Sequence, residues 1–238
     1  TMKSPVVRVL ASAVLGMALL AAGCSETMNV SQTRSYDQTF LSNYKNLQPR
    51  GKDFLYRTPD SQRLLAAARG VMIDQPEIRM APDSPTGAKP ADLTAIAEAL
   101  RSQLVEALTK SGYNVVTEPG PNIMLLRTAF TDVYMETKPR GVLGYTPIGF
   151  VVKAGVDAMQ TVMENNDILG ITLQAELTDP KALIFELVAP RGGNKQVITF
   201  DQYKQQMQTW GQRLACQVSN SKLPAAQQVD CSTLGSTG

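Results

Sequence analysis

The residues that could do chemistry are few, and the 238-residue chain contains no histidine. Without histidine there is no Ser-His-Asp triad, no Cys-His pair and no His-ligated zinc. Ser42 and Lys45 have the Ser-x-x-Lys spacing of some hydrolases, but the S-D-N and K-T-G motifs that accompany it are missing. Because histidine also performs most proton transfers near neutral pH, the composition argues against an enzyme.

Charged side chains inside apolar segments are the second group of candidates. Arg127 and Asp132 lie in a mostly apolar strand, and Glu176 lies on the polar face of another. If buried together, they would have to pair and could mark a polar pocket. A surface salt bridge or simple solvent exposure is the alternative, and we favour it. Residues 164–167 carry oxygen ligands without the spacing of a calcium loop, so we expect a polar turn, no metal and no cofactor.

An apolar stretch at residues 141–152 combines hydrophobic side chains with glycines at four-residue spacing and leads into a helix-like segment at 153–163. One interpretation is a core loop followed by a short packing helix. The other is an exposed apolar lip that contacts a membrane, a lipid or a partner. The side chains that would form this contact surface are Tyr145, Ile148, Phe150 and Val151.

The amino terminus has the pattern of an export signal. Lys3 and Arg8 precede an uncharged apolar stretch, Val9–Ala22, which is shorter than the roughly 20 residues of a membrane-spanning helix. The segment Leu20–Cys24 resembles the lipobox of bacterial lipoproteins, with alanine where leucine is commonest at the position after Leu20. The resemblance implies that residues 1–23 are a signal peptide and that Cys24 is acylated. Ser25 implies sorting to the outer membrane, with the domain facing the periplasm, whereas the alternative is an ordinary secretory signal followed by an unmodified cysteine.

Loss of this signal would also change the charge of the protein. It removes two of the 23 basic residues and leaves 21 against 21 acidic ones. The sequence has no clustered basic face of the kind that nucleic acids require. We therefore expect a membrane partner through the lipid anchor and an envelope protein partner, but no nucleic acid.

The two remaining cysteines, Cys216 and Cys231, lie 15 positions apart near the carboxyl end. In an oxidising periplasm we expect a disulfide that pins the tail, residues 221–238, onto the last helix. Two free thiols are the alternative. A metal or redox role is disfavoured, because there is no C-x-x-C motif and no histidine.

Hydrophobic periodicity predicts a single α+β domain over 40–220, preceded by a lipidated tether at 24–39. We expect a two-layer sandwich, with a mostly antiparallel or mixed sheet of about five strands packed by two long helices. Aromatic clusters between residues 40 and 56 should form an arm that docks across the domain. The second helix should start at Thr199, with Gln202 completing a capping box. The other expected elements are strands near 71–79, 113–116, 123–136, 171–178 and 182–188 and a helix at 91–110.

An ordered series of short motifs resembles the DUF3313 lipoprotein family. It comprises Phe40–Tyr44 with Leu47 and Pro49, then Phe54–Tyr56, Val71–Asp74, Val115–Pro121, Arg127–Asp132 and the Trp210 helix. The resemblance implies a bacterial envelope lipoprotein of unknown biochemical role, with no catalytic residues to carry over. The first hypothesis is therefore a non-enzymatic interaction module in the envelope. The alternatives are a lipoprotein that binds a lipid or small apolar ligand and, third, a His-independent hydrolase.

Overall fold

The computed structural model describes residues 36–85, 89–138, 156–180, 182–192, 197–220 and 223–234, all within one compact unit that begins at Tyr36. The α+β class is confirmed. In these ranges the sheet is mixed and has eight strands, and there are four α-helices, so the expectation of about five strands and two helices was too low.

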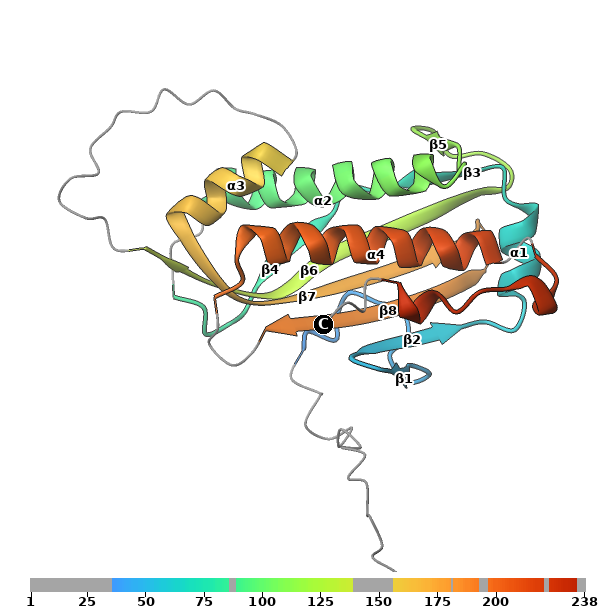
Figure 1. Ribbon diagram of the computed structural model, residues 1–238, viewed down its shortest axis with the longest axis horizontal. Coiled ribbons are helices and arrows are strands. Elements are labelled where there is room, and N and C mark those ends of the chain that lie inside the picture. Colours follow the sequence, from blue (N-terminus) through green and yellow to red (C-terminus); the bar gives the residue numbers. More distant parts are fainter. Residues whose placement is uncertain are drawn as a thin grey trace, which may run out of the picture. The chain divides into compact units, whose positions relative to one another are not determined.

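The eight strands form one sheet in the order β1-β2-β8-β7-β6-β3-β5, and β4 also pairs with β6 (Figure 1). The pairs β3–β5, β3–β6 and β4–β6 are parallel, and the others are antiparallel. The strands are β1 (Gln48–Arg50), β2 (Asp53–Arg57), β3 (Gly70–Ile73), β4 (Glu77–Met80), β5 (Val115–Val116), β6 (Ile123–Thr137), β7 (Asn166–Thr178) and β8 (Leu183–Gly192).

Two differences explain the higher strand count. The single strand expected at 71–79 is divided at Pro76 into β3 and β4, because proline cannot donate to the ladder. The hairpin of β1 and β2 pairs with β8 through Leu55↔Leu187, two segments far apart in the sequence. Strands this short carry little periodicity, so only their pairing identifies them.

Two long helices cover one face of the sheet (Figure 1). They are α2 (Pro90–Lys110) and α4 (Phe200–Asn220), and the shorter α1 (Ser61–Ala67) and α3 (Val156–Asn165) complete the set. The expected capping box is confirmed at α4: Thr199 Oγ1 accepts from Gln202 N–H, and Gln202 Oε1 accepts from Thr199 N–H. Among the helices in the described ranges, none combines the length and the apolar composition of a membrane-spanning segment.

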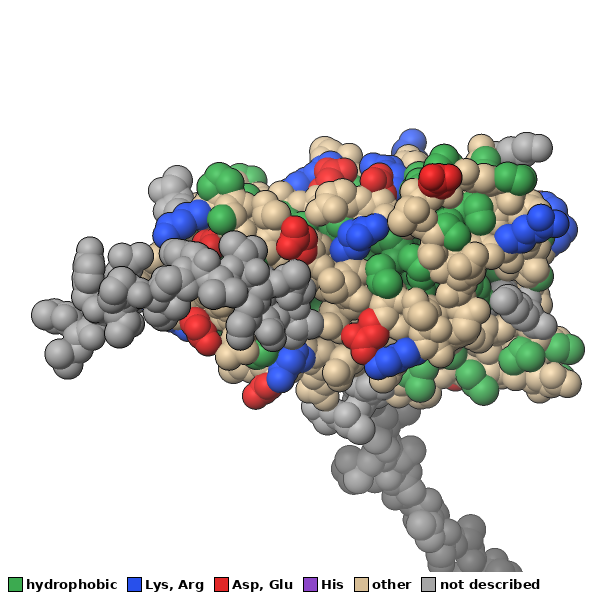
Figure 2. Space-filling model, turned by 90° about the horizontal axis from the view of Figure 1, so that it is seen from above, with side chains coloured by type: hydrophobic (Ala, Val, Ile, Leu, Met, Phe, Trp, Pro, Cys, Tyr) green, Lys and Arg blue, Asp and Glu red, His purple; other side chains and the backbone are tan. Residues whose placement is uncertain are grey.

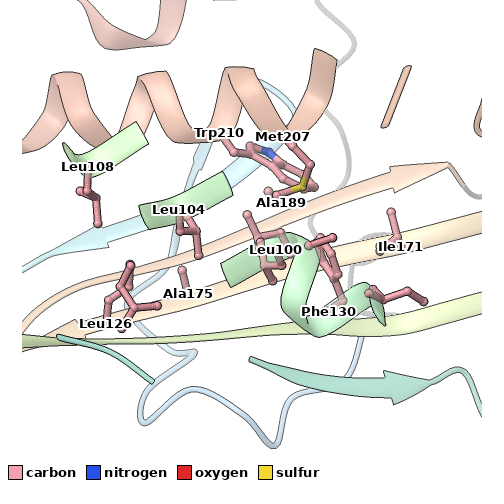
Figure 3. Packing of buried hydrophobic residues seen from close by; sticks show 14 of the residues in the cluster. Leu100, Leu104, Leu108, Leu126, Phe130, Ile171, Ala175, Ala189, Met207 and Trp210 are labelled. Carbon is pink, nitrogen blue, oxygen red and sulfur yellow. The ribbon is translucent and has the colours of Figure 1, made fainter. Parts of the chain in front are cut away.

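The hydrophobic core fills the space between these helices and the sheet. Figure 3 shows side chains from α2, α4 and the strands pointing toward one another. The ring centroids of Trp210 and Phe130 lie 6.0 Å apart. The two helices cross closely, since a Cβ added at Gly211 would lie 2.6 Å from the Cβ of Ala107. The labelled core residues are Leu100, Leu104, Leu108, Leu126, Phe130, Ile171, Ala175, Ala189, Met207 and Trp210.

The opposite face of the sheet is covered by residues 36–47, which we call the arm. Phe40 and Leu41 of the arm are buried with Phe54, Ala129 and Val188 in a second apolar cluster. The expectation that the early aromatic clusters form an arm docked across the domain is confirmed for residues 40–44, and this arm adds a layer to the expected two. It was wrong for Phe54–Tyr56, which belong to β2 and pair with β8 inside the sheet. On the described part of the helix side, by contrast, acidic and basic side chains are interspersed (Figure 2).

Candidate functional site

A pocket of about 430 Å³ opens at the edge of the helix layer, between α4, the β2–β8 pair and the carboxyl-terminal tail. We call it the tail pocket. It is lined by Arg50, Asp53, Leu55, Arg57, Phe185, Leu187, Trp210, Arg213, Leu214, Gln217, Asn220, Val229, Asp230 and Cys231.

The floor of the tail pocket is apolar because of strand register. Leu55 lies opposite Leu187, and Arg57 lies opposite Phe185, so all four side chains are on the helix face of the sheet. Leu55, Leu187 and Phe185 form the apolar floor, and Arg57 lies at its rim. Leu55 and Leu187 are only half-buried, since the helix layer does not extend fully over β2. Trp210 of α4 borders the same space, and its buried Nε1–H has no acceptor within the described ranges.

The outer wall of the pocket is held by the disulfide between Cys216 and Cys231, whose Cα atoms lie 5.7 Å apart. The tail contains two short 3-10 helices, η1 (Ala225–Gln227) and η2 (Cys231–Thr233). Asn220, at the end of α4, donates to the carbonyl of Val229 and accepts from its N–H. The expected cross-link is therefore present, and it places tail residues at the rim of the pocket.

One carboxylate of the pocket is already neutralised by arginines. Asp53 is buried, and its two oxygens lie 2.7 Å from Arg191 and 3.2 Å from Arg213. Arg191 also lies over the Trp210 ring, 5.6 Å from its centroid. This cluster joins β2, β8 and α4 beside the pocket floor.

Two other arginines at the pocket rim are not neutralised in this way. Arg50 and Arg57 are exposed and form no ion pair with any residue of the described ranges. The pKa of Arg57 lies below its ordinary value because its guanidinium is partly desolvated and because Arg50 is also positive. The rim is thus a place where an anion would be favoured.

The three charged residues singled out in the sequence all contact the arm rather than the tail pocket. Glu176 accepts from Ser42 N–H at 2.7 Å and from Arg127 at 3.0 Å. Asp132 accepts from Asp37 N–H at 2.9 Å. The favoured expectation of surface exposure was wrong for Glu176, which is 2% exposed, because the arm covers the polar face of β7.

Asp132 reaches the arm through an unusual backbone conformation. Its φ is +52°, and the register of β6 against β7 shifts at this point. Aspartate tolerates the left-handed region better than most residues, and the bulge turns the carboxylate toward Asp37 N–H. The irregularity in β6 thus provides the arm with a hydrogen-bond acceptor for Asp37 N–H.

Sequence reasoning missed the residue with the most perturbed acidity in this interface, Glu186. It is fully buried, lies opposite Glu176 in the β7–β8 register and accepts from Asn43 N–H at 2.6 Å. Burial and, to a smaller extent, the charge of Glu176 raise the pKa of Glu186 to about 7, although the hydrogen bond from Asn43 lowers it. Its second oxygen has no hydrogen-bond partner among the described residues, and a buried oxygen without a donor favours the neutral carboxyl over the carboxylate.

The remaining candidates fall into two groups. Cys24 and the apolar side chains Tyr145, Ile148, Phe150 and Val151 lie outside the described residues. Ser42 and Lys45 are exposed, and Ser42 contributes its backbone N–H to Glu176. Instead of forming a separate turn, residues 164–167 join α3 directly to β7, and the described residues contain no group of three metal-ligating side chains.

A family model for a protein of unknown function, DUF3313, matches residues 36–214. The chain belongs to the DUF3313 family. The family match begins at the start of the arm and ends within α4, so it includes both faces of the sheet. No curated protein matches the chain.

Two solved structures show a weak likeness to this DUF3313 protein, both of the PelC dodecamer from Paraburkholderia phytofirmans. A point variant in space group C2 is 16% identical, covering 63% of this chain and 85% of that one, with a TM-score of 0.32. The protein in space group P6 is 15% identical over 63% and 88%, with a TM-score of 0.30.

The sequence of this DUF3313 protein carried no clear signal for the tail pocket. Asp53, Leu55 and Arg57 share one face of β2, but this strand is identified only by its pairing with β8. What could not be seen was that α4 and the tail approach this face, because both come more than 140 positions later in the chain.

Proposed function

We propose that this chain is a non-enzymatic lipoprotein of the bacterial envelope, held at the outer membrane by acyl groups on Cys24, and that its domain binds a small apolar ligand in the tail pocket. The single observation that carries the proposal is the pocket itself. Its volume of about 430 Å³ and its floor of Leu55, Phe185, Leu187 and Trp210 fit the concave, mainly apolar sites that small molecules occupy.

The envelope part of the proposal has separate support. The lipobox-like segment before Cys24 favours an acyl anchor, which is stable in a membrane when two or more chains are attached. The disulfide between Cys216 and Cys231 suits an oxidising compartment such as the periplasm. Incorporation of labelled palmitate into the wild-type chain, and its loss in Cys24→Ala, tests the anchor independently of the pocket.

Trp210 supplies the probe for ligand binding, because it is the only tryptophan of the chain and it borders the tail pocket. The processed, lipidated protein in a nanodisc is titrated with single-chain lipids whose acyl chains carry bromine, which quenches tryptophan at short range. We expect saturable quenching in the wild type. Leu187→Phe, which adds a larger side chain to the pocket floor, should weaken the quenching, whereas Val197→Phe, at an exposed position outside the pocket, should not. Quenching that is absent, or equal in both variants, would contradict the proposal.

A second candidate function, contact with an envelope protein, is favoured by one observation. Of the four exposed large hydrophobic side chains in the described ranges, Leu223, Val229 and Leu234 belong to the tail. A photo-crosslinking residue at Val229, compared with one at Val197, tests this surface in intact cells. A defined partner captured only from Val229, and lost with Cys24→Ala, would support an anchored interaction module.

A further inference from the structure

We infer that the ligand of the tail pocket is a single-chain anionic lipid, with its carboxylate or phosphate head at Arg50 and Arg57 and its acyl chain over Leu55 and Leu187. This inference rests on the proposed binding function and adds the chemical class of the ligand. It follows from charge complementarity and from the arrangement of apolar and basic side chains around the cavity.

The head-group position is given by two cavities that share residues. A second cavity, of about 450 Å³, adjoins the β1–β2 hairpin and is lined by Asn46, Gln48, Arg50, Leu55, Tyr56 and Arg57. Arg50, Leu55 and Arg57 also line the tail pocket. Both arginines therefore stand between the apolar floor and a more polar, open space, which is where a solvated head group would lie.

The charges around the pocket indicate one anionic group rather than several. Three arginines line it, and two carboxylates, Asp53 and Asp230, line it as well. Asp53 is engaged by Arg191 and Arg213, and Asp230 has a contact of its own. Arg50 and Arg57 remain as the cations without a carboxylate in the described ranges, so a single carboxylate or phosphate group matches them, whereas a larger polyanion would approach Asp230.

The apolar floor excludes a small inorganic anion as the natural occupant. Leu55, Leu187 and Leu214 present half-buried hydrocarbon to the cavity, and Val229 of the tail is 62% exposed beside it. Covering this surface with an acyl chain removes its hydrocarbon from water, which favours binding in proportion to the apolar area buried. A neutral lipid would gain the same contact but would leave both arginines without a counterion.

The test compares head groups on one acyl chain, using Trp210 quenching in the lipidated protein. The probes are dibromostearate, its methyl ester, and a lysophosphatidic acid with the same brominated chain. The variants are Arg50→Gln with Arg57→Gln, the charge-conserving Arg57→Lys, and Arg63→Gln, an exposed arginine outside the pocket that pairs with Asp60.

We expect the double variant to weaken anionic binding by about tenfold or more, since a charge-assisted hydrogen bond contributes about 1.5–3 kcal/mol. Arg57→Lys should retain part of the affinity, and Arg63→Gln should match the wild type. Tighter binding of dibromostearate than of the lysophosphatidic acid would assign a carboxylate head, and the reverse order a phosphate.

Two other results separate the failure of this inference from failure of the proposed function. Equal binding of the ester and both anions, unaffected by the double variant, would overturn the anionic head group and leave apolar binding intact. Absence of quenching by all three probes would overturn both. Thermal unfolding of each variant verifies that a loss of binding does not reflect a loss of fold.

Discussion

The two faces of the sheet are built from the same strands and are closed in different ways. In one row across β6, β7 and β8, Leu126, Leu177 and Phe185 face the helices, and all three are buried. In the adjacent row, Arg127, Glu176 and Glu186 face the arm. Moving by one residue along each strand thus changes the side chains of the row from three apolar groups to an arginine and two carboxylates.

The physical reason for this difference is the element that covers each face. The helices α2 and α4 satisfy most of their backbone hydrogen bonds internally, so only apolar contact is needed beneath them. The arm is irregular over residues 39–47, and its N–H groups need acceptors from the sheet. Glu176, Glu186 and Asp132 supply them. The helix face therefore depends on packing, and the arm face depends on charge and protonation.

The largest expected effect is a cavity on the helix face. Phe130→Ala should lower the free energy of unfolding by about 3–5 kcal/mol, because Phe130 is fully buried against Trp210. Phe40→Ala, on the arm face, should release residues 36–47 to proteases with a smaller change in global unfolding. Denaturant unfolding of both variants measures their global stability, and limited proteolysis measures how readily residues 36–47 are cleaved. Equal losses of global stability would show that the two faces unfold as one unit.

The next effect concerns the tail. Replacing Cys216 and Cys231 by serine should cost about 3 kcal/mol on the chain-entropy account of a 15-residue loop, and should weaken ligand quenching at Trp210. Adding a reductant to the wild type should reproduce both changes and leave the double-serine variant unaffected. A wild type that is insensitive to a reductant able to open the disulfide would contradict this role of the cross-link.

Close packing between α2 and α4 should respond to a single methyl group. Gly211→Ala would ordinarily favour a helix, yet here it should destabilise by about 1–3 kcal/mol, since its Cβ would overlap Ala107. Combining it with Ala107→Gly should recover part of the loss. Thermal melts of both single variants and the pair give the coupling energy, and strict additivity would show that the helices do not touch there.

The smallest effect is a pH dependence specific to the arm face. The pKa of Glu186 is raised from 4.5 to about 7, so its contribution is complete below about pH 4.5 and is lost as the pH rises through 7. Between pH 6 and pH 8 this loss is on the order of 1 kcal/mol. The groups facing Glu186 are Glu176 and Tyr56 on the neighbouring strands, Arg127 beyond Glu176, and Asn43 of the arm.

Glu186→Gln removes this titration while keeping an oxygen that can accept from Asn43 N–H. The difference in stability between the variant and the wild type should therefore grow in favour of the variant from pH 6 to pH 8. Glu136→Gln, at an exposed position near the end of β6, serves as the control. Parallel pH profiles for Glu186→Gln and the wild type would show that Glu186 does not titrate in this range.

Local patterns were enough to predict the long elements and both ends of the cross-link. The apolar stripe of α2 is confirmed by the burial of Ile96, Leu100, Leu104 and Leu108. The capping box at Thr199 and the disulfide between Cys216 and Cys231 are also present as expected. Each of these features depends on residues that are close in the sequence, at most 15 positions apart for the two cysteines.

The sequence by itself determined the order of the long elements, the start of α4 and the cysteine pair, because helical stripes, caps and short loops are local properties. Only the tertiary structure decided that the arm would bury Glu176 and Glu186, and that β2, α4 and the tail would enclose a pocket. These features join segments that are far apart in the sequence: Asn43 and Glu186 are 143 positions apart, and Asp53 and Arg213 are 160 apart. The solvent exposure of a polar strand face depends on what folds over it.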